Sequence, residues 1–157
     1  MTRLRYVGVV LVLLASAPAA AMPLALNVGV LEARALPDDH IGVYPYLAVS
    51  DERELGPFIV LPSVGAEWCP ETGRWGLIAT VVADYPVGEA IGLDLLATLI
   101  HDQDGAGFGD ALFLLGVGPG LSITVEPVVV SPFVFFYKLL NAPGFSWSPG
   151  LNIALEM

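Results

Sequence analysis

The sequence predicts an all-β fold: a single antiparallel up-and-down β-barrel of about eight strands, occupying residues 22–157 after an N-terminal signal peptide. Two observations predict it. Apolar residues alternate with small or polar residues along most of the chain, which is the period-two pattern of a strand. Groups of Pro, Gly, Asn and Asp interrupt this alternation at regular intervals, as turns do. A length of 157 residues fits one domain.

Residues 1–21 are predicted to be the signal peptide. Arg3 and Arg5 precede an apolar stretch over residues 7–14, and Ala19 and Ala21 supply the small side chains that a signal peptidase requires. The apolar part is shorter than the ~20 residues of a membrane-spanning helix. Removing the two arginines takes the net charge from −10 to −12. We therefore expect an exported, acidic chain.

Eight strands are predicted near residues 24–34, 40–50, 57–68, 74–85, 90–101, 108–117, 121–138 and 145–156. Their turns are predicted at residues 36–39, 50–56, 69–73, 85–88, 102–107, 116–120 and 141–144. Most of these strands match the ~9–11 residues with which a tilted strand crosses a bilayer.

The last predicted strand shows the pattern most clearly. Phe145, Trp147 and Leu151 share one face with the other odd-numbered residues up to Met157, and Ser146 and Asn152 share the opposite face. The same alternation of apolar residues with small or polar ones runs through residues 41–50, 74–85 and 90–101.

Prolines interrupt several predicted strands. Pro45, Pro62, Pro127 and Pro149 each remove a hydrogen-bond donor from a ladder, which barrels tolerate at bulges. The segment 121–138 is too long for one strand, so we expect it to bend at Ser131–Pro132 or to split in two.

Composition excludes other classes of protein. Hydrophobic residues make up 55% of the chain and charged residues 14%, so the chain is not disordered. Only 6 basic residues oppose 16 acidic ones, which argues against a nucleic-acid partner. Cys69 is the single cysteine, so a disulfide framework is excluded.

Taken together, the signal peptide, the even number of alternating strands and the short turns resemble the small bacterial outer-membrane β-barrels. Aromatic residues near strand ends match the girdles of that class: Trp68, Trp75, Tyr85, Tyr137, Phe145 and Trp147. The resemblance implies a structural or interaction role in the outer membrane, without catalysis or a cofactor. It also implies two partners, membrane lipid or lipopolysaccharide and the outer-membrane assembly machinery.

Two alternatives remain open. The first is a soluble exported barrel, periplasmic or secreted, which binds a lipid or another apolar ligand among Leu96, Ile100, Leu112 and Leu114. The second is a barrel-embedded lipid-modifying enzyme that uses His101.

Polar residues on the predicted inner faces form the candidate site. An interior cluster is expected from Thr124, Glu126 and Asn152 together with Asp94 and Asp110. It is either a relay for protons or cations or, as we favour, a hydrogen-bonded plug. Near the outer rim, Glu67 and Lys138 are expected to pair.

The acidic segment after residue 101 resembles the start of a calcium loop. Asp102, Asp104 and Asp110 are the candidate ligands. Ala106 and Phe113, however, occupy positions where such a loop needs oxygen ligands. A flexible hairpin loop without a metal is therefore the favoured interpretation.

Overall fold

The computed structural model describes residues 24–35, 41–71, 73–103, 112–140, 143 and 145–156. The predicted signal peptide lies outside these ranges. Ten strands form one antiparallel sheet. They are β1 (Leu24–Ala35), β2 (Ile41–Val43), β3 (Tyr46–Asp51), β4 (Arg53–Leu55), β5 (Phe58–Cys69), β6 (Arg74–Pro86), β7 (Ile91–Gln103), β8 (Leu112–Val125), β9 (Val128–Leu139) and β10 (Phe145–Glu156). In the described ranges, no helix is long and apolar enough to cross a membrane.

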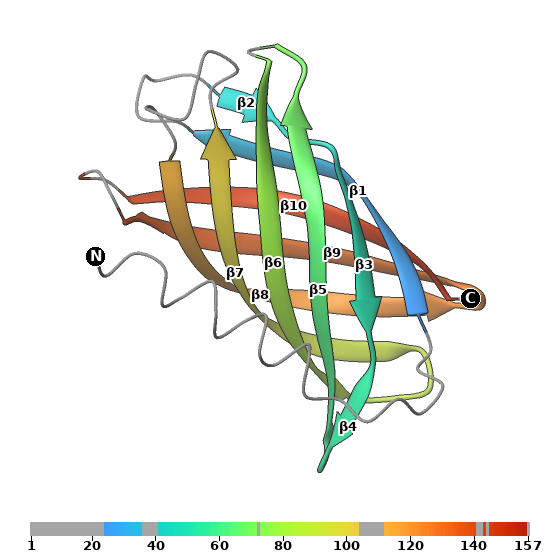
Figure 1. Cartoon of the computed structure of the whole chain (residues 1–157). Coiled ribbons are helices and arrows are strands. Elements are labelled where there is room, and N and C mark those ends of the chain that lie inside the picture. Colours follow the sequence, from blue (N-terminus) through green and yellow to red (C-terminus); the bar gives the residue numbers. More distant parts are fainter. Residues whose placement is uncertain are drawn as a thin grey trace.

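The sheet closes on itself. Each long strand pairs with its neighbour in sequence, and β10 returns to pair with β1, from Ala25 opposite Glu156 to Glu32 opposite Gly150. In Figure 1, β3, β5, β6 and β7 cross in front of β1, β9 and β10, as the two walls of a barrel do. Because β1 and β10 pair with each other, neither of these two strands is left as an open sheet edge.

The short strands β2, β3 and β4 are successive segments of one interrupted strand. β2 and β3 both pair with β1, and β3 and β4 both pair with β5 in the same register. The first interruption lies at Tyr44 and Pro45, where the Pro45 carbonyl still accepts a hydrogen bond from the Trp68 N–H at 3.0 Å. The barrel therefore has the eight strands that the sequence predicts.

The two ends of the barrel differ. One end, here called the turn end, carries the start of β1, the end of β10 and the connections at Gly56–Pro57, residues 87–90 and Glu126–Pro127. Gly56 has a φ of 63°, which suits the first central position of a two-residue hairpin turn. The other end, the loop end, carries the connections over residues 36–40, 70–73, 104–111 and 140–144.

The predicted turn at residues 116–120 is wrong. β8 runs without a break through this segment, and the hairpin turn lies at Glu126–Pro127, whose peptide bond is cis. The segment 121–138 therefore does split in two, but at residues 126–127 and not at Ser131–Pro132. Val125 pairs with Val128 across this turn.

Glycines in β8 occupy the inner face, where they make room for large rings. Gly116 lies opposite Tyr137 and Gly120 opposite Phe133. A Cβ atom at Gly116 would lie 2.5 Å from Cε1 of Tyr137. The glycine-rich segment is thus part of the packing of the barrel interior and is not a turn.

Candidate functional site

The outer face of the barrel is apolar. Every strand from β3 to β10 exposes at least one large apolar side chain, among them Leu77, Leu95 and Val117. Val117 is next to Ala97 on one side and Phe136 on the other, so the apolar surface continues from strand to strand. Soluble monomers rarely expose an apolar patch of more than a few hundred Å². The outer face of this barrel therefore differs from the surface of a typical soluble monomer.

Aromatic side chains gather at the two edges of this face. Trp68 and Trp75 form a cross-strand pair near the loop end, close to the strand ends where Phe145 and Trp147 are also exposed. At the turn end, Tyr85 lies 5.7 Å from Phe58 between ring centroids. These residues have the positions of the aromatic girdles of a membrane barrel.

Tyr137 does not belong to this group. It is fully buried inside the barrel, and the predicted girdle position is wrong. The two-residue turn places Val125 and Val128 on the same face. From the sequence, residues 121–138 are predicted as one segment. Continuing the alternation through it without this turn assigns every β9 side chain to the wrong face.

Charged and polar side chains fill the lumen at the loop end. Asp102 is fully buried and accepts a hydrogen bond from the Tyr44 hydroxyl at 3.4 Å. The Nε of Arg74 lies 3.5 Å from Oδ1 of the same carboxylate. Glu67 and Cys69 are buried in the same layer of the barrel, Cys69 against Tyr44. These five residues are called the loop-end cluster below.

Large apolar side chains fill the middle of the lumen. Phe133, Phe135 and Tyr137 stack along β9 with ring centroids 4.9 and 5.4 Å apart. Ile100 and Leu114 are buried against them. This packing separates the loop-end cluster from the turn-end half of the lumen.

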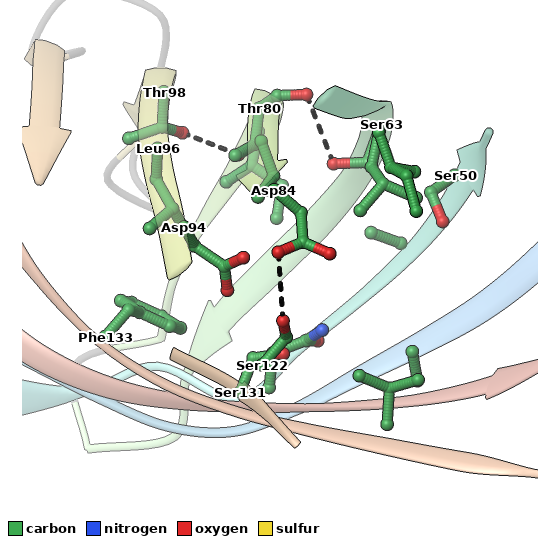
Figure 2. A pocket seen from close by; sticks show the side chains of 18 of the residues that line it. Ser50, Ser63, Thr80, Asp84, Asp94, Leu96, Thr98, Ser122, Ser131 and Phe133 are labelled. Atoms are coloured by element: carbon green, nitrogen blue, oxygen red, sulfur yellow. Dashed lines mark hydrogen bonds between the residues drawn. The ribbon is translucent and has the colours of Figure 1, made fainter. Parts of the chain in front are cut away.

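A cavity of about 430 Å³ occupies the turn-end half of the lumen. Hydroxyl groups line one wall, where the Thr80 and Thr98 hydroxyls lie 2.8 Å apart and the Ser63 hydroxyl donates to the Thr80 carbonyl (Figure 2). The lining also includes Leu96 from β7 and extends to the exposed residue Glu52 at the turn end. The cavity is therefore mixed in polarity.

Two aspartates face each other in this cavity. Asp84 of β6 and Asp94 of β7 are direct cross-strand partners. The Ser122 hydroxyl donates to Oδ1 of Asp84 at 3.2 Å (Figure 2). Oδ1 of Asp94 is buried and has no hydrogen-bond partner. Two acidic side chains therefore lie side by side in this part of the lumen wall.

The structure brings together three of the five residues of the predicted interior polar cluster. Asp94, Thr124 and Asn152 line the cavity, and the Asn152 Oδ1 accepts a hydrogen bond from the Tyr46 hydroxyl at 3.0 Å. Glu126 does not lie inside the barrel, because it is exposed in the β8–β9 turn. Asp110 lies outside the described residues.

The predicted rim pair is not brought together. Glu67 is buried in the interior at β5, whereas Lys138 is exposed on β9 between the buried residues Tyr137 and Leu139. Adjacent residues of a strand point to opposite faces, so Lys138 belongs to the outer face. The cause is the same misplaced turn that put Tyr137 in the girdle.

The residues of the two alternative functions lie as follows. Leu96, Ile100 and Leu114 are buried in the apolar core of the lumen, where Leu96 and Ile100 also line the cavity; the side chain of Leu112 lies outside the described residues. His101 is on the outer face, 4.7 Å from Phe113 between ring centroids.

Of the predicted calcium ligands, only Asp102 falls in the described ranges. Its side chain points into the barrel toward Arg74 and not into the loop. Asp104 and Asp110 lie outside those ranges. Among the residues that the structure describes, no group of three or more His, Cys, Asp or Glu side chains could hold a metal ion.

We did not predict from the sequence that Asp84 and Asp94 face each other, or that Ser122 donates a hydrogen bond to Asp84. The signal was present, since Asp84 precedes and Asp94 follows the turn at residues 87–90 by similar distances in the sequence. Pairing the two strands about that turn would have placed the carboxylates opposite each other.

No protein-family model and no curated protein matches this sequence. The fold is similar to that of several solved structures. One comes from the de novo design of transmembrane β-barrels (14% identity, 86% of this chain and 95% of that chain, TM-score 0.54). Another is Neisserial surface protein A, NspA (12% identity, 90% and 100%, TM-score 0.54). A third is the Yersinia pestis outer membrane protein Ail in a phospholipid bilayer nanodisc (13% identity, 85% and 99%, TM-score 0.51). At these identities the likeness concerns the fold, and the chain therefore has the fold of the small outer-membrane β-barrels.

Proposed function

We propose that this protein is exported and spans the bacterial outer membrane, where it has a structural or interaction role and no catalytic one. The observation that carries the proposal is the apolar outer face, which is exposed on every strand from β3 to β10. In lipid, a closed barrel also satisfies every backbone hydrogen bond. The likeness of the fold to membrane barrels supports the same proposal.

The difference between the two ends suggests the orientation. Membrane barrels of this kind have short periplasmic turns and longer external loops. We therefore assign the turn end to the periplasm and the loop end to the exterior. In this orientation residues 1–21 direct export, the outer-membrane assembly machinery inserts the barrel, and membrane lipid or lipopolysaccharide contacts its outer face.

The lumen supports a scaffold and not a general pore. Tyr137 and Ile100 fill its middle, and the loop-end cluster fills the part next to the external loops. An enzyme that uses His101 as a base would need a serine hydroxyl within its reach. His101 is on the outer face, whereas Ser146 and Ser148 are buried inside. The sheet lies between these groups.

Fractionation of a Gram-negative host that expresses the full chain tests the proposal. We expect the protein in the outer-membrane fraction, resistant to extraction with urea and soluble only in detergent. We also expect its migration on a gel to change when the sample is boiled, as folded barrels do. A variant that lacks residues 2–21 is the control, and it should remain in the cytoplasm.

A soluble monomer in the periplasm or medium, obtained without detergent, would contradict membrane insertion. That result would favour the soluble exported barrel that binds an apolar ligand.

A further inference from the structure

The cavity in the turn-end half of the lumen has the size of a ligand site. Its volume of about 430 Å³ lies within the range of ~300–1,000 Å³ that small-molecule pockets occupy. Phe133 and Phe135 are part of its lining and close it toward the middle of the barrel, and it reaches exposed Glu52 at the turn end. Among the described residues, the lining therefore gives a small molecule a route of entry at the turn end.

All the charged side chains in the described lining of the cavity are acidic. Asp51, Glu52, Asp84 and Asp94 line it, and none of the lining residues in the described ranges is basic. Oδ2 of Asp51 forms an ion pair with Arg53 at 2.9 Å, whereas its Oδ1 has no hydrogen-bond partner. The two facing aspartates lie deeper in the barrel, and none of the described residues that line the cavity around them is basic.

Asp94 is the lining residue whose carboxylate is best placed to bind a ligand. The residue is only 8% exposed, it lines the cavity, and its Oδ1 has no hydrogen-bond partner. Figure 2 shows its carboxylate turned toward Asp84 and Ser122. A buried carboxylate oxygen without a partner is costly unless a donor or a cation meets it. A cation placed between Asp84 and Asp94 would meet both carboxylates.

The rest of the lining favours an organic ammonium ion over a bare metal ion. No group of three metal-binding side chains exists among the described residues, so a bare metal ion lacks ligands. Hydroxyl oxygens of Thr98 and Ser122 can accept N–H donors. Leu96 and Phe133 provide an apolar wall, and an aromatic ring also attracts an ammonium group.

We propose that this cavity binds a small primary alkylammonium ion, with its ammonium group between Asp84 and Asp94 and its alkyl chain against Leu96 and Phe133. This proposal depends only on the interior of the barrel and does not require that the barrel is inserted in a membrane. Its test therefore uses the full chain folded in detergent micelles.

The experiment titrates the folded barrel with n-butylammonium chloride and follows binding by calorimetry and by amide shifts in NMR spectra. We expect saturable binding, with the largest shifts at residues such as Thr98 and Ser122. The neutral isostere 1-butanol and the anion butyrate should not reproduce it. Asp84→Asn and Asp94→Asn should each weaken binding by about tenfold or more, because each removes a charge-assisted hydrogen bond.

Glu126→Gln is the matched control. It removes the same charge at the same end of the barrel but from the exposed turn, outside the cavity. It should change the affinity by less than about twofold. Heat-dependent migration on a gel verifies that each variant is folded.

Four results would overturn the proposal. They are the absence of saturable binding to the folded wild-type barrel, equal binding of 1-butanol, equal shifts on addition of potassium or calcium chloride alone, and an equal loss of affinity in Glu126→Gln.

Discussion

Two valines of β8 provide a sharp test of where the outer face meets lipid. Val117 and Val125 both point outward, with exposed fractions of 52% and 67%. Val117 lies near the middle of the strand and Val125 at its last residue. With a rise of ~3.4 Å per residue and a tilt of ~40°, the two side chains lie roughly 20 Å apart along the barrel axis.

This separation sets the size of the effect. The apolar band of a membrane barrel is ~25 Å tall, so Val117 falls near the centre of the band and Val125 at or beyond its edge. An arginine costs ~2–4 kcal/mol at the bilayer midplane and ~0–1 kcal/mol near the interface. Val117→Arg should therefore reduce the free energy of unfolding by about 2 kcal/mol more than Val125→Arg does.

The assay is equilibrium unfolding in urea of the barrel reconstituted in phospholipid vesicles. The two variants start from the same residue type, strand and face, so their difference reports depth. If the outer face contacted water, both substitutions would lie within ~0.5 kcal/mol of the wild type. Equal costs for the two variants would refute the assignment of this face to lipid.

Three further predictions concern the lumen and use the same unfolding assay. Gly116→Val should cost ~1–3 kcal/mol because the added side chain meets the ring of Tyr137, and a neutral result would mean that the ring has room to move. Ile100→Ala should cost ~2–5 kcal/mol because Ile100 is 1% exposed; a loss below ~1 kcal/mol would indicate a loosely packed lumen. Arg74→Met should cost ~3–5 kcal/mol because it leaves the buried Asp102 without its ion pair. Adding Asp102→Asn should recover much of that loss, and strictly additive losses would show that the two residues are not coupled.

The sequence determines which face of most strands points outward, and this could be predicted. Trp75 and Leu77 alternate with Gly76 and Ile78, and Phe145 alternates with Ser146, as the structure has them. The period of two is a local property, because successive side chains of a strand always point to opposite faces. The fold class and the eight-stranded count followed from that pattern and from the turn residues.

The segment from Gly116 to Pro127 could not be divided correctly from local signals. Glycine and proline at residues 116–120 are typical of a turn, but the glycines serve the packing of Phe133 and Tyr137 from the neighbouring strand. That requirement is visible only once β8 and β9 are paired. A single misplaced turn then reversed the predicted faces of Tyr137 and Lys138.

The candidate site depends on contacts between strands that are distant in sequence. The surroundings of Asp94 are decided by β6, which places Asp84 opposite it, and by β8, whose Ser122 donates to Asp84. Whether space remains beside it is decided by the volume of Phe133 on β9. The sequence alone predicted a polar interior at Asp94 and Asn152, but not the cavity between them.

The three tryptophans of the chain allow the most direct test of membrane insertion. Trp68, Trp75 and Trp147 are all on the outer face near the loop end. The barrel is reconstituted in vesicles whose lipids carry bromine atoms either close to the headgroup or close to the bilayer centre, and tryptophan fluorescence is recorded. We predict strong quenching that is greatest for bromines near the headgroup, where aromatic girdles lie. Fluorescence equal to that in unbrominated vesicles, with the barrel folded, would contradict the assignment of this outer face to lipid.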